Sequence, residues 1–377
     1  MLARFIDAPL PRATSYPPLM RTPGGPTNSI GMAGMRNADF SPRRCTPSFE
    51  AAGLQRSRPA TEEHYMTERL ITHLRYLALA VPELEREVDF FTRHWGLTEV
   101  SRSDDTVYLA AEGSPEQYIL RIRKGTKRID LISFGAASAS DVDRLAANLA
   151  EAGVQIVHEP RALSQPGGGY GFRFFDIDGR TIEISSDVAV RPHRKIEARE
   201  PVPVRLSHVV VNSTNPEATR TFYEERLAFA LSDTLNSKTM GDLMYFMRCN
   251  DHHHSFAIAR GPHASLHHAS FEMRGIEEWM RGTGKILRSG ARMVWGPGRH
   301  NAGDNTFAYF IDPQGNTIEY TTELATIEDE DAWHPSILDV DNVHTQDQWG
   351  TANEMNEYVA RESFNDVDAG LFVAPPV

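Results

Sequence analysis

The chain repeats itself, and this internal duplication restricts its fold more than any other feature of the sequence. The segment "HLRYLALAVPELEREVDFFTRHWGL" parallels "RLSHVVVNSTNPEATRTFYEERLAF", which places Tyr76 opposite His208 at an offset of 132 residues. Near the other end of each copy, "FFDIDGRTIEISSD" parallels "FIDPQGNTIEYTTE", which places Glu183 opposite Glu319 at an offset of 136 residues. Because self-similarity at a fixed spacing marks repeated structural units, we expect two homologous domains.

Both copies have the same order of elements, which indicates the α+β class. Each opens with a strand, continues through an amphipathic helix and finishes in short strands separated by turn residues. In the second copy Asn215 is expected to cap a helix that begins at Pro216, since asparagine favours the N-cap and proline the first helical position. Prolines at positions 192, 201 and 203 mark a linker, so we expect domains over residues 66–190 and 204–325.

Residues 1–65 have a composition that opposes folding. The first 60 residues hold eight Arg, no Lys, three acidic residues and nine Pro, and they show no sustained hydrophobic period. Such a segment cannot bury enough apolar area to offset its ordering entropy, so we expect this Arg/Pro-rich extension to be disordered. Met66 opens the ordered pattern and is expected to be the working start of the protein.

The residues after Glu323 form a separate C-terminal tail. The acidic run "IEDEDAWHPS" leads into a segment that contains Trp333, Trp349 and Phe364. Aromatic side chains are uncommon in a solvated tail. We therefore expect residues 326–377 to pack on the C-terminal domain or at a subunit interface.

Composition limits the partners of the chain. The formal net charge is −12, and this excess of carboxylates opposes binding of a nucleic acid. No run approaches the roughly 18 apolar residues that a membrane helix needs, so we expect no membrane partner. The two cysteines, Cys45 and Cys249, lie 204 positions apart and favour a reducing, cytoplasmic location. These limits favour a small-molecule ligand.

The copies differ at positions that carry chemistry. Where the second copy has His208, the first has Tyr76. Where the second has His268, the first has Leu131, and only Glu319 keeps its residue type. Two imidazoles and one carboxylate leave adjacent coordination positions open, which suits non-haem Fe(II), and Mn(II) accepts the same donors. We therefore predict one metal site, in the second copy.

A predicted hairpin brings a phenol beside the carboxylate of that site. Two strand-like runs flank the loop at 312–316, whose Pro and Gly are typical turn residues. A hairpin symmetric about this loop pairs Ile311 with Thr317 and Tyr309 with Glu319. Directly opposed residues bring their Cβ atoms to about 4.5–5.5 Å, so the Tyr309 side chain should lie next to Glu319.

Strand alternation predicts which residues share a face of the sheet with each of the two histidines. In "RLSHVVVNS" it puts His208 on the same face as Leu206 and Val210, and in "LHHASFEM" it puts His268 on the same face as Ser270. The polar faces of separate strands are then expected to converge on one cavity.

Five short segments of the second copy carry a family resemblance: "LSHVVVNS", "NDHHHSFAIA", "LHHASFE", "WGPGRHNAGDNTFAYF" and "DPQGNTIEY". In this order and spacing the chain resembles the type I extradiol ring-cleaving dioxygenases of the vicinal oxygen chelate superfamily, over roughly Met66 to Leu324. By that resemblance the metal ligands match His208, His268 and Glu319. The residues that line the substrate and oxygen sites match His254, His300 and Tyr309.

The resemblance implies a fold and an activity. The fold is two domains, each of two βαβββ modules, with metal only in the C-terminal domain. The activity is cleavage of a catechol-type ring beside its two hydroxyls by O2 and Fe(II), in the degradation of aromatic compounds. His254, directly before "SFAIA", would be the acid/base, and His300 and Tyr309 would hold the substrate oxygens. The family also implies a homo-oligomer.

Other functions use the same module. A glyoxalase-like isomerase or a hydroxyphenylpyruvate-type dioxygenase also employs two His and one Glu, but the isomerase has no evident need for the three further residues together. A ligand-sequestering protein of the bleomycin-resistance kind needs no iron. The remaining histidines of these segments are interpreted as structural: His252, His253, His263 and His267.

Overall fold

A computed structural model describes residues 68–352 and 365–376, which belong to one compact unit, Glu62–Val377. The predicted disordered extension, residues 1–65, and the aromatic residue Phe364 lie outside the described residues. Within the described ranges, no helix is long and apolar enough to cross a bilayer.

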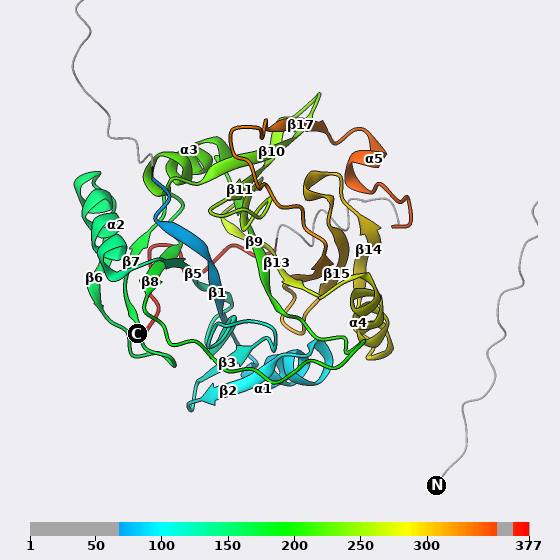
Figure 1. Ribbon diagram of the computed structural model, residues 1–377, viewed down its shortest axis with the longest axis horizontal. Helices are drawn as coiled ribbons and strands as arrows, with labels where there is room; N and C mark the ends of the chain where they lie inside the picture. The colour runs from blue at the N-terminus through cyan, green and yellow to red at the C-terminus, as the bar shows by residue number, and fades with distance from the viewer. Residues whose placement is uncertain (1–67, 353–364, 377) are drawn as a thin grey trace, which may run out of the picture. The chain divides into compact units, whose positions relative to one another are not determined.

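Four βαβββ modules follow one another along the chain. The first is β1 (Ile71–Val81), α1 (Leu84–Asp89), β2 (Thr98–Arg102), β3 (Thr106–Ala110) and β4 (Leu120–Lys124), with a π-helical turn, Phe90–Trp95, after α1. The second is β5 (Arg128–Ala136), α2 (Ala139–Glu151), β6 (Ile156–Ala162), β7 (Tyr170–Phe175) and β8 (Thr181–Ser186). The expected tandem modules of the α+β class are confirmed (Figure 1).

The second half repeats this plan and adds a C-terminal extension. The third module is β9 (Arg205–Ser213), α3 (Pro216–Leu227), β10 (Ala230–Ser237), β11 (Gly241–Arg248) and β12 (Phe256–Arg260). The fourth is β13 (Ser265–Glu272), α4 (Ile276–Arg288), β14 (Met293–Arg299), β15 (Thr306–Ile311) and β16 (Thr317–Thr322), with a 3-10 turn, Ala302–Asp304, before β15. The extension supplies β17 (Ser336–Asp339) and α5 (Val343–Gln346).

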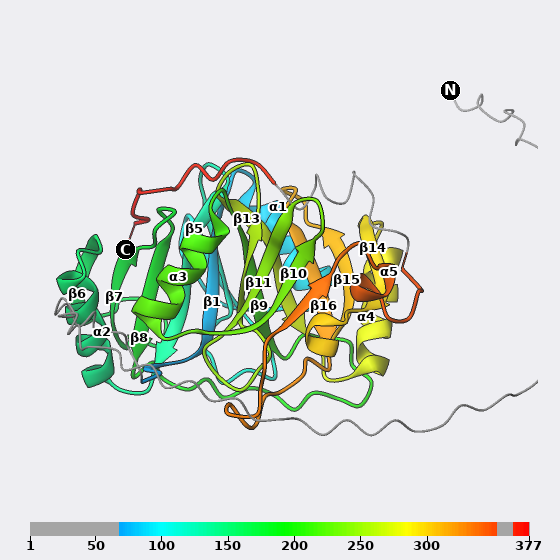
Figure 2. The same ribbon diagram turned by 90° about the horizontal axis from the view of Figure 1, so that it is seen from above.

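The two halves form sheets with the same strand order. The first sheet runs β2-β3-β4-β1-β5-β8-β7-β6. The second runs β10-β11-β12-β9-β13-β16-β15-β14, and β17 joins it by pairing parallel to β10 (Figure 2). The duplication seen in the sequence is therefore a duplication of topology.

Local signals in the sequence set two element boundaries. The side chain of Asn215 accepts a hydrogen bond from the backbone N–H of Ala218 at 3.2 Å, and Pro216 is the first residue of α3, as predicted. In the β15–β16 turn, Asp312 Oδ1 accepts from the backbone N–H of Asn316 at 2.7 Å. This turn fixes the register of β15 and β16.

The predicted hairpin pairing is confirmed. Tyr309 lies opposite Glu319, and Ile311 lies opposite Thr317.

A β-bulge changes the expected facing of one residue. His208 pairs with Ser270, whereas the next pair joins Leu206 to Phe271, so Ser207 is an extra residue in β9. An extra residue interrupts the alternation of side chains. Leu206 therefore packs in the main apolar core, whereas His208 lines a cavity on the other face of the sheet. The prediction that the two share a face is wrong.

Bulges recur at equivalent places in both sheets. In β13 the extra residue is His267. In the first sheet the extra residues are Arg75 in β1 and Asp130 in β5. Arg75 and Asp130 precede Tyr76 and Leu131 just as Ser207 and His267 precede His208 and His268, so the repeat includes these irregularities of the backbone.

One aromatic contact joins the first half to the strand that carries Glu319. Trp95, at the end of the π-helical turn, stacks on Tyr320 of β16 with ring centroids 3.8 Å apart, and the Tyr320 hydroxyl donates to the Trp95 carbonyl. Since successive side chains of a strand point to opposite faces, anchoring Tyr320 in the core directs Glu319 to the other face.

The first half contains a counterpart of the predicted metal site. Glu183 is 1% exposed and accepts from Arg173 Nε and from the Tyr76 hydroxyl, both at 2.8 Å. Burial opposes ionisation of this carboxyl, but Arg173 and Tyr76 lower its pKa below the usual value. Arg173 pairs with Glu183 as Tyr309 pairs with Glu319, so a guanidinium neutralises the carboxylate in this half.

We predict that Arg173→Met lowers the free energy of unfolding by about 3–5 kcal/mol, because it leaves a buried carboxylate without its cation. Urea-induced unfolding measures this loss. The double variant Arg173→Met/Glu183→Leu should regain most of it, and Arg161→Met, at an exposed position of β6, is the control. An equal loss in the single and double variants would contradict the role of the ion pair.

Candidate metal centre

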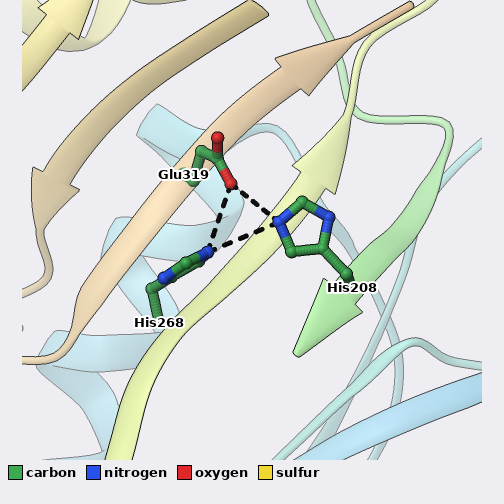
Figure 3. A group of neighbouring side chains, drawn as sticks. All are labelled: His208, His268 and Glu319. Atoms are coloured by element: carbon green, nitrogen blue, oxygen red, sulfur yellow. Dashed lines mark hydrogen bonds and ion pairs between the residues drawn. The ribbon is translucent and has the colours of Figure 1, made fainter. Parts of the chain in front are cut away.

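Three adjacent strands bring His208, His268 and Glu319 together (Figure 3). Ser270 of β13 pairs with His208 of β9 on one side and with Glu319 of β16 on the other, so these residues form one row across the sheet. His268 lies two residues before Ser270 and therefore on the same face. The three side chains each offer a ligand atom, and these atoms lie within 4.8 Å of one another.

The distances within this group match a shared centre. Nε2 of His208 lies 3.0 Å from Oε2 of Glu319, and Nε2 of His268 lies 3.5 Å from the same oxygen. The two Nε2 atoms are 3.4 Å apart. All three side chains are buried, and Glu319 is 0% exposed.

The chemistry of these donors fits a divalent cation. Oε2 of Glu319 contacts the two imidazole nitrogens, and burying a carboxylate without a cation is costly. Burial, followed by the neighbouring imidazoles, lowers the pKa of His268 well below its usual value, so its ring is neutral and offers a lone pair. A cation bound here would supply the charge that Arg173 supplies in the first half.

The bulge residues contact the outer nitrogens of the two histidines. Nδ1 of His208 lies 3.2 Å from the Ser207 hydroxyl, and Nδ1 of His268 lies 2.7 Å from Nδ1 of His267. Contacts at Nδ1 orient each ring and leave Nε2 for the centre. His267 was interpreted from the sequence as structural, and the structure places it as the partner of His268.

His254 lies against the metal group from the turn between β11 and β12. It is 3% exposed, and its ring centroid is 4.2 Å from that of His208 and 4.9 Å from that of Phe246. Burial, followed by the surrounding imidazoles, lowers the pKa of His254 well below its usual value. The ring is therefore neutral.

His300 and Tyr309 form a hydrogen-bonded pair on the other side. Nδ1 of His300 donates to the backbone carbonyl of Gln346 at 2.9 Å, which leaves Nε2 to accept from the Tyr309 hydroxyl at 3.0 Å. Burial and then the facing Glu319 carboxylate raise the pKa of Tyr309 well above its usual value, so its hydroxyl stays protonated. Gln346 belongs to the C-terminal tail and was not expected at the site.

These residues line one cavity of about 590 Å³, within the usual range of ligand sites. The predicted site residues on its wall are His208, His254, His268, His300 and Tyr309. Apolar side chains form much of the rest: Val210, Leu235, Leu243, Met244, Phe246, Val294 and Trp295. Val340 and Thr345 of the tail also contribute, whereas His252 and His263 are not on the wall.

The tail reaches this wall because it pairs with the second sheet. β17 pairs with β10, and the backbone carbonyl of Thr345 accepts from the N–H of Asn301, next to His300. Asp347 accepts from the N–H of Arg299 at 3.0 Å. The tail thus fixes the segment that carries His300.

Comparison with known proteins identifies the family. The model of the Glyoxalase/Bleomycin resistance protein/Dioxygenase superfamily matches residues 72–184 and 205–320, which correspond to the two sheets. Metapyrocatechase 2 of Cupriavidus necator is 27% identical over 312 residues, 76% of this chain and 91% of that protein. The manganese-dependent 2,3-dihydroxybiphenyl 1,2-dioxygenase of Geobacillus genomosp. 3 is 28% identical over 279 residues, 69% of this chain and 87% of that protein.

The chain is also similar to a solved structure. The Mn(II)-bound glyoxalase from Novosphingobium aromaticivorans is 36% identical, with a TM-score of 0.74 over 81% of this chain and 98% of that chain. The sequence resemblance, the four modules and these comparisons agree. The chain belongs to the Glyoxalase/Bleomycin resistance protein/Dioxygenase superfamily and has its vicinal oxygen chelate fold.

Proposed function

We propose that the protein is an extradiol dioxygenase that uses O2 and Fe(II) to cleave a catechol-type ring next to its two hydroxyls. The observation that supports this most is the convergence of His208, His268 and Glu319 next to a cavity that is also lined by His254 and the His300–Tyr309 pair. Two of the relatives are named as a metapyrocatechase and a 2,3-dihydroxybiphenyl 1,2-dioxygenase, which agrees with the proposal.

The three converging side chains would hold the metal. When bound, Fe(II) supplies Lewis acidity and adjacent open positions for the catechol oxygens and for dioxygen. Mn(II) accepts the same donors, and one relative is named as manganese-dependent.

The other polar residues handle the substrate. His254, which lines the cavity, takes a proton from a substrate hydroxyl and returns it later in the reaction. The Tyr309 oxygen, whose hydrogen is donated to His300, accepts a hydrogen bond from a substrate hydroxyl, and His300 holds Tyr309 in place, which fixes the ring relative to the metal ligands. The apolar walls exclude water, which strengthens these interactions.

The wall composition favours an uncharged, apolar ring substituent. Arg260 is the one Lys or Arg on the described wall, and its guanidinium already donates to the backbone carbonyl of Asp242 and to the Glu217 carboxylate. A carboxylate on the substrate would therefore be buried without a cation, which is costly. A bare catechol would leave most of the cavity unfilled.

A second candidate is a glyoxalase-type isomerase. It is favoured by the 36% identity to the Mn(II)-bound glyoxalase, which exceeds the identity to the two dioxygenases. Such a reaction needs a metal and a base, but it gives no evident use to His254, His300 and Tyr309 together. Their joint presence makes the dioxygenase the better supported candidate.

We predict that chelation abolishes activity and that Fe(II), added without oxygen, restores it. After catechol and air are added, a yellow muconic semialdehyde-type product should form with consumption of O2, measured by visible absorbance and an oxygen electrode. The same preparation is assayed with the hemithioacetal of methylglyoxal and glutathione. Isomerisation without ring cleavage would establish the second candidate instead.

We predict different defects for two site variants. Glu319→Ala should lose bound metal and activity together, because it removes the anionic ligand. His254→Ala should keep its metal and lose ring cleavage by about 10²–10⁴-fold, because it removes the acid/base. Metal content and initial rates measure both effects. His263→Ala is the matched control, since His263 lies off the cavity wall, and near-normal turnover by His254→Ala would refute its role.

We predict that a 3-phenylcatechol has a kcat/KM at least about 10-fold above that of a catechol with a carboxylate substituent, because the carboxylate finds no free cation. Met244→Lys places an ammonium group on the wall and should narrow or reverse this ratio. Steady-state kinetics with both substrates measures it. A wild-type preference for the carboxylate would contradict the proposed substituent.

A further inference from the structure

We propose that Asp233 and His253 are positioning residues that hold His254 in the tautomer required of a base. This inference rests on the proposed function, because it assigns the acid/base step to His254. A series of hydrogen bonds links the side chains of Asp233, His253 and His254 and runs from β10 to the cavity wall. His253 was interpreted from the sequence as structural, and Asp233 carried no signal there.

Short distances and burial define this hydrogen-bonded series. Nε2 of His253 lies 2.9 Å from Oδ2 of Asp233, and Nδ1 of His253 lies 3.0 Å from Nδ1 of His254. Asp233 is 5% exposed, His253 0% and His254 3%, so water does not compete for these contacts. The three side chains therefore form one buried hydrogen-bonded series.

The surroundings fix both supporting residues. The other oxygen of Asp233, Oδ1, accepts from the backbone N–H of Ser336 in β17 at 2.8 Å. The backbone N–H of His253 donates to the Ala325 carbonyl at 2.8 Å, and the Ser232 hydroxyl donates to the His253 carbonyl. The ring of Trp333 packs edge-on against His253 with centroids 5.7 Å apart. The tail thus anchors Asp233 and covers His253.

The hydrogen bonds determine where each proton lies. A carboxylate has no proton to give, so Asp233 accepts and Nε2 of His253 carries hydrogen. One hydrogen lies between the two Nδ1 atoms, and with Nε2 of His253 already donating to Asp233 we assign that hydrogen to His254, so Nδ1 of His253 accepts it. The remaining nitrogen of His254, Nε2, is left unprotonated. Because His254 lines the cavity, this is the nitrogen available to the substrate.

Proton transfer to His254 follows from this arrangement. The substrate O–H bond breaks as the Nε2–H bond forms, and no electron leaves or enters. His254 then carries a positive charge while its Nδ1–H bond to His253 remains in place. The Asp233 carboxylate, at the far end of the series, keeps His253 as the acceptor of this hydrogen bond, as a carboxylate orients a histidine base in hydrolases.

Asp233→Asn tests the inference with little change in shape. Ser336 N–H requires an oxygen at Oδ1, so the amide NH2 faces His253 and donates to Nε2. Nδ1 of His253 must then carry hydrogen and donate to His254, which moves the His254 proton to Nε2 and removes its base. We expect kcat to fall by about 10²-fold or more with metal content, thermal midpoint and KM near those of the wild type.

Two further variants complete the series. Asp233→Glu keeps the carboxylate and should retain more activity than Asp233→Asn. Asp143→Asn removes a carboxylate that accepts one hydrogen bond from the Tyr170 hydroxyl on the exposed side of α2, and it should leave kcat unchanged. An Asp233→Asn variant with full metal content and wild-type kcat would overturn the inference.

A spectroscopic readout separates this inference from the proposed function. In the diamagnetic Zn(II)-loaded full chain with ¹⁵N-labelled histidine, the nitrogen shifts should place hydrogen on Nδ1 of His254 in the wild type and on Nε2 in Asp233→Asn. Hydrogen on Nε2 in the wild type would refute the positioning role even if ring cleavage is observed. Conversely, a wild type with the expected tautomer but no ring cleavage would refute the proposed function alone.

Discussion

The structure depends on how a buried glutamate in each half is neutralised. Glu183 and Glu319 occupy equivalent places on β8 and β16, and both are almost completely buried. An ionised carboxylate in such a place requires a positive partner. The first half provides Arg173, and the second provides two imidazoles that, together with Glu319, suit a cation. One duplicated scaffold thus yields an ion pair on one side and a candidate metal centre on the other.

Much of the fold and of the candidate site could be predicted because short-range patterns encode them. The Asn215 cap and the pairing of Tyr309 with Glu319 follow from residues a few positions apart, and both are confirmed. His208 and His268 stood out because the duplication supplied a reference copy with different residues. Their convergence follows from the pairing of three neighbouring strands.

The remaining features depend on contacts that leave no mark on local sequence. The extra residue in β9 cannot be recognised from alternation alone, so the prediction that Leu206 lies on the same face as His208 was wrong. The contacts of His300 with the Gln346 carbonyl and of Asp233 with the Ser336 N–H involve backbone atoms, which every residue type offers. The first spans 46 residues and the second 103, and only the folded tail brings the partners together.

Two separate parts of the chain build the wall of the cavity: the modules of the second half and the C-terminal tail. Strands β9, β13 and β16 carry the three converging ligand atoms, whereas Val340, Thr345 and Gln346 belong to a later segment outside the four modules. Substitutions in that segment can therefore alter which ligands fit the cavity while the ligand strands keep their register. A related chain with a different ending would inherit the same candidate metal centre with a different cavity wall.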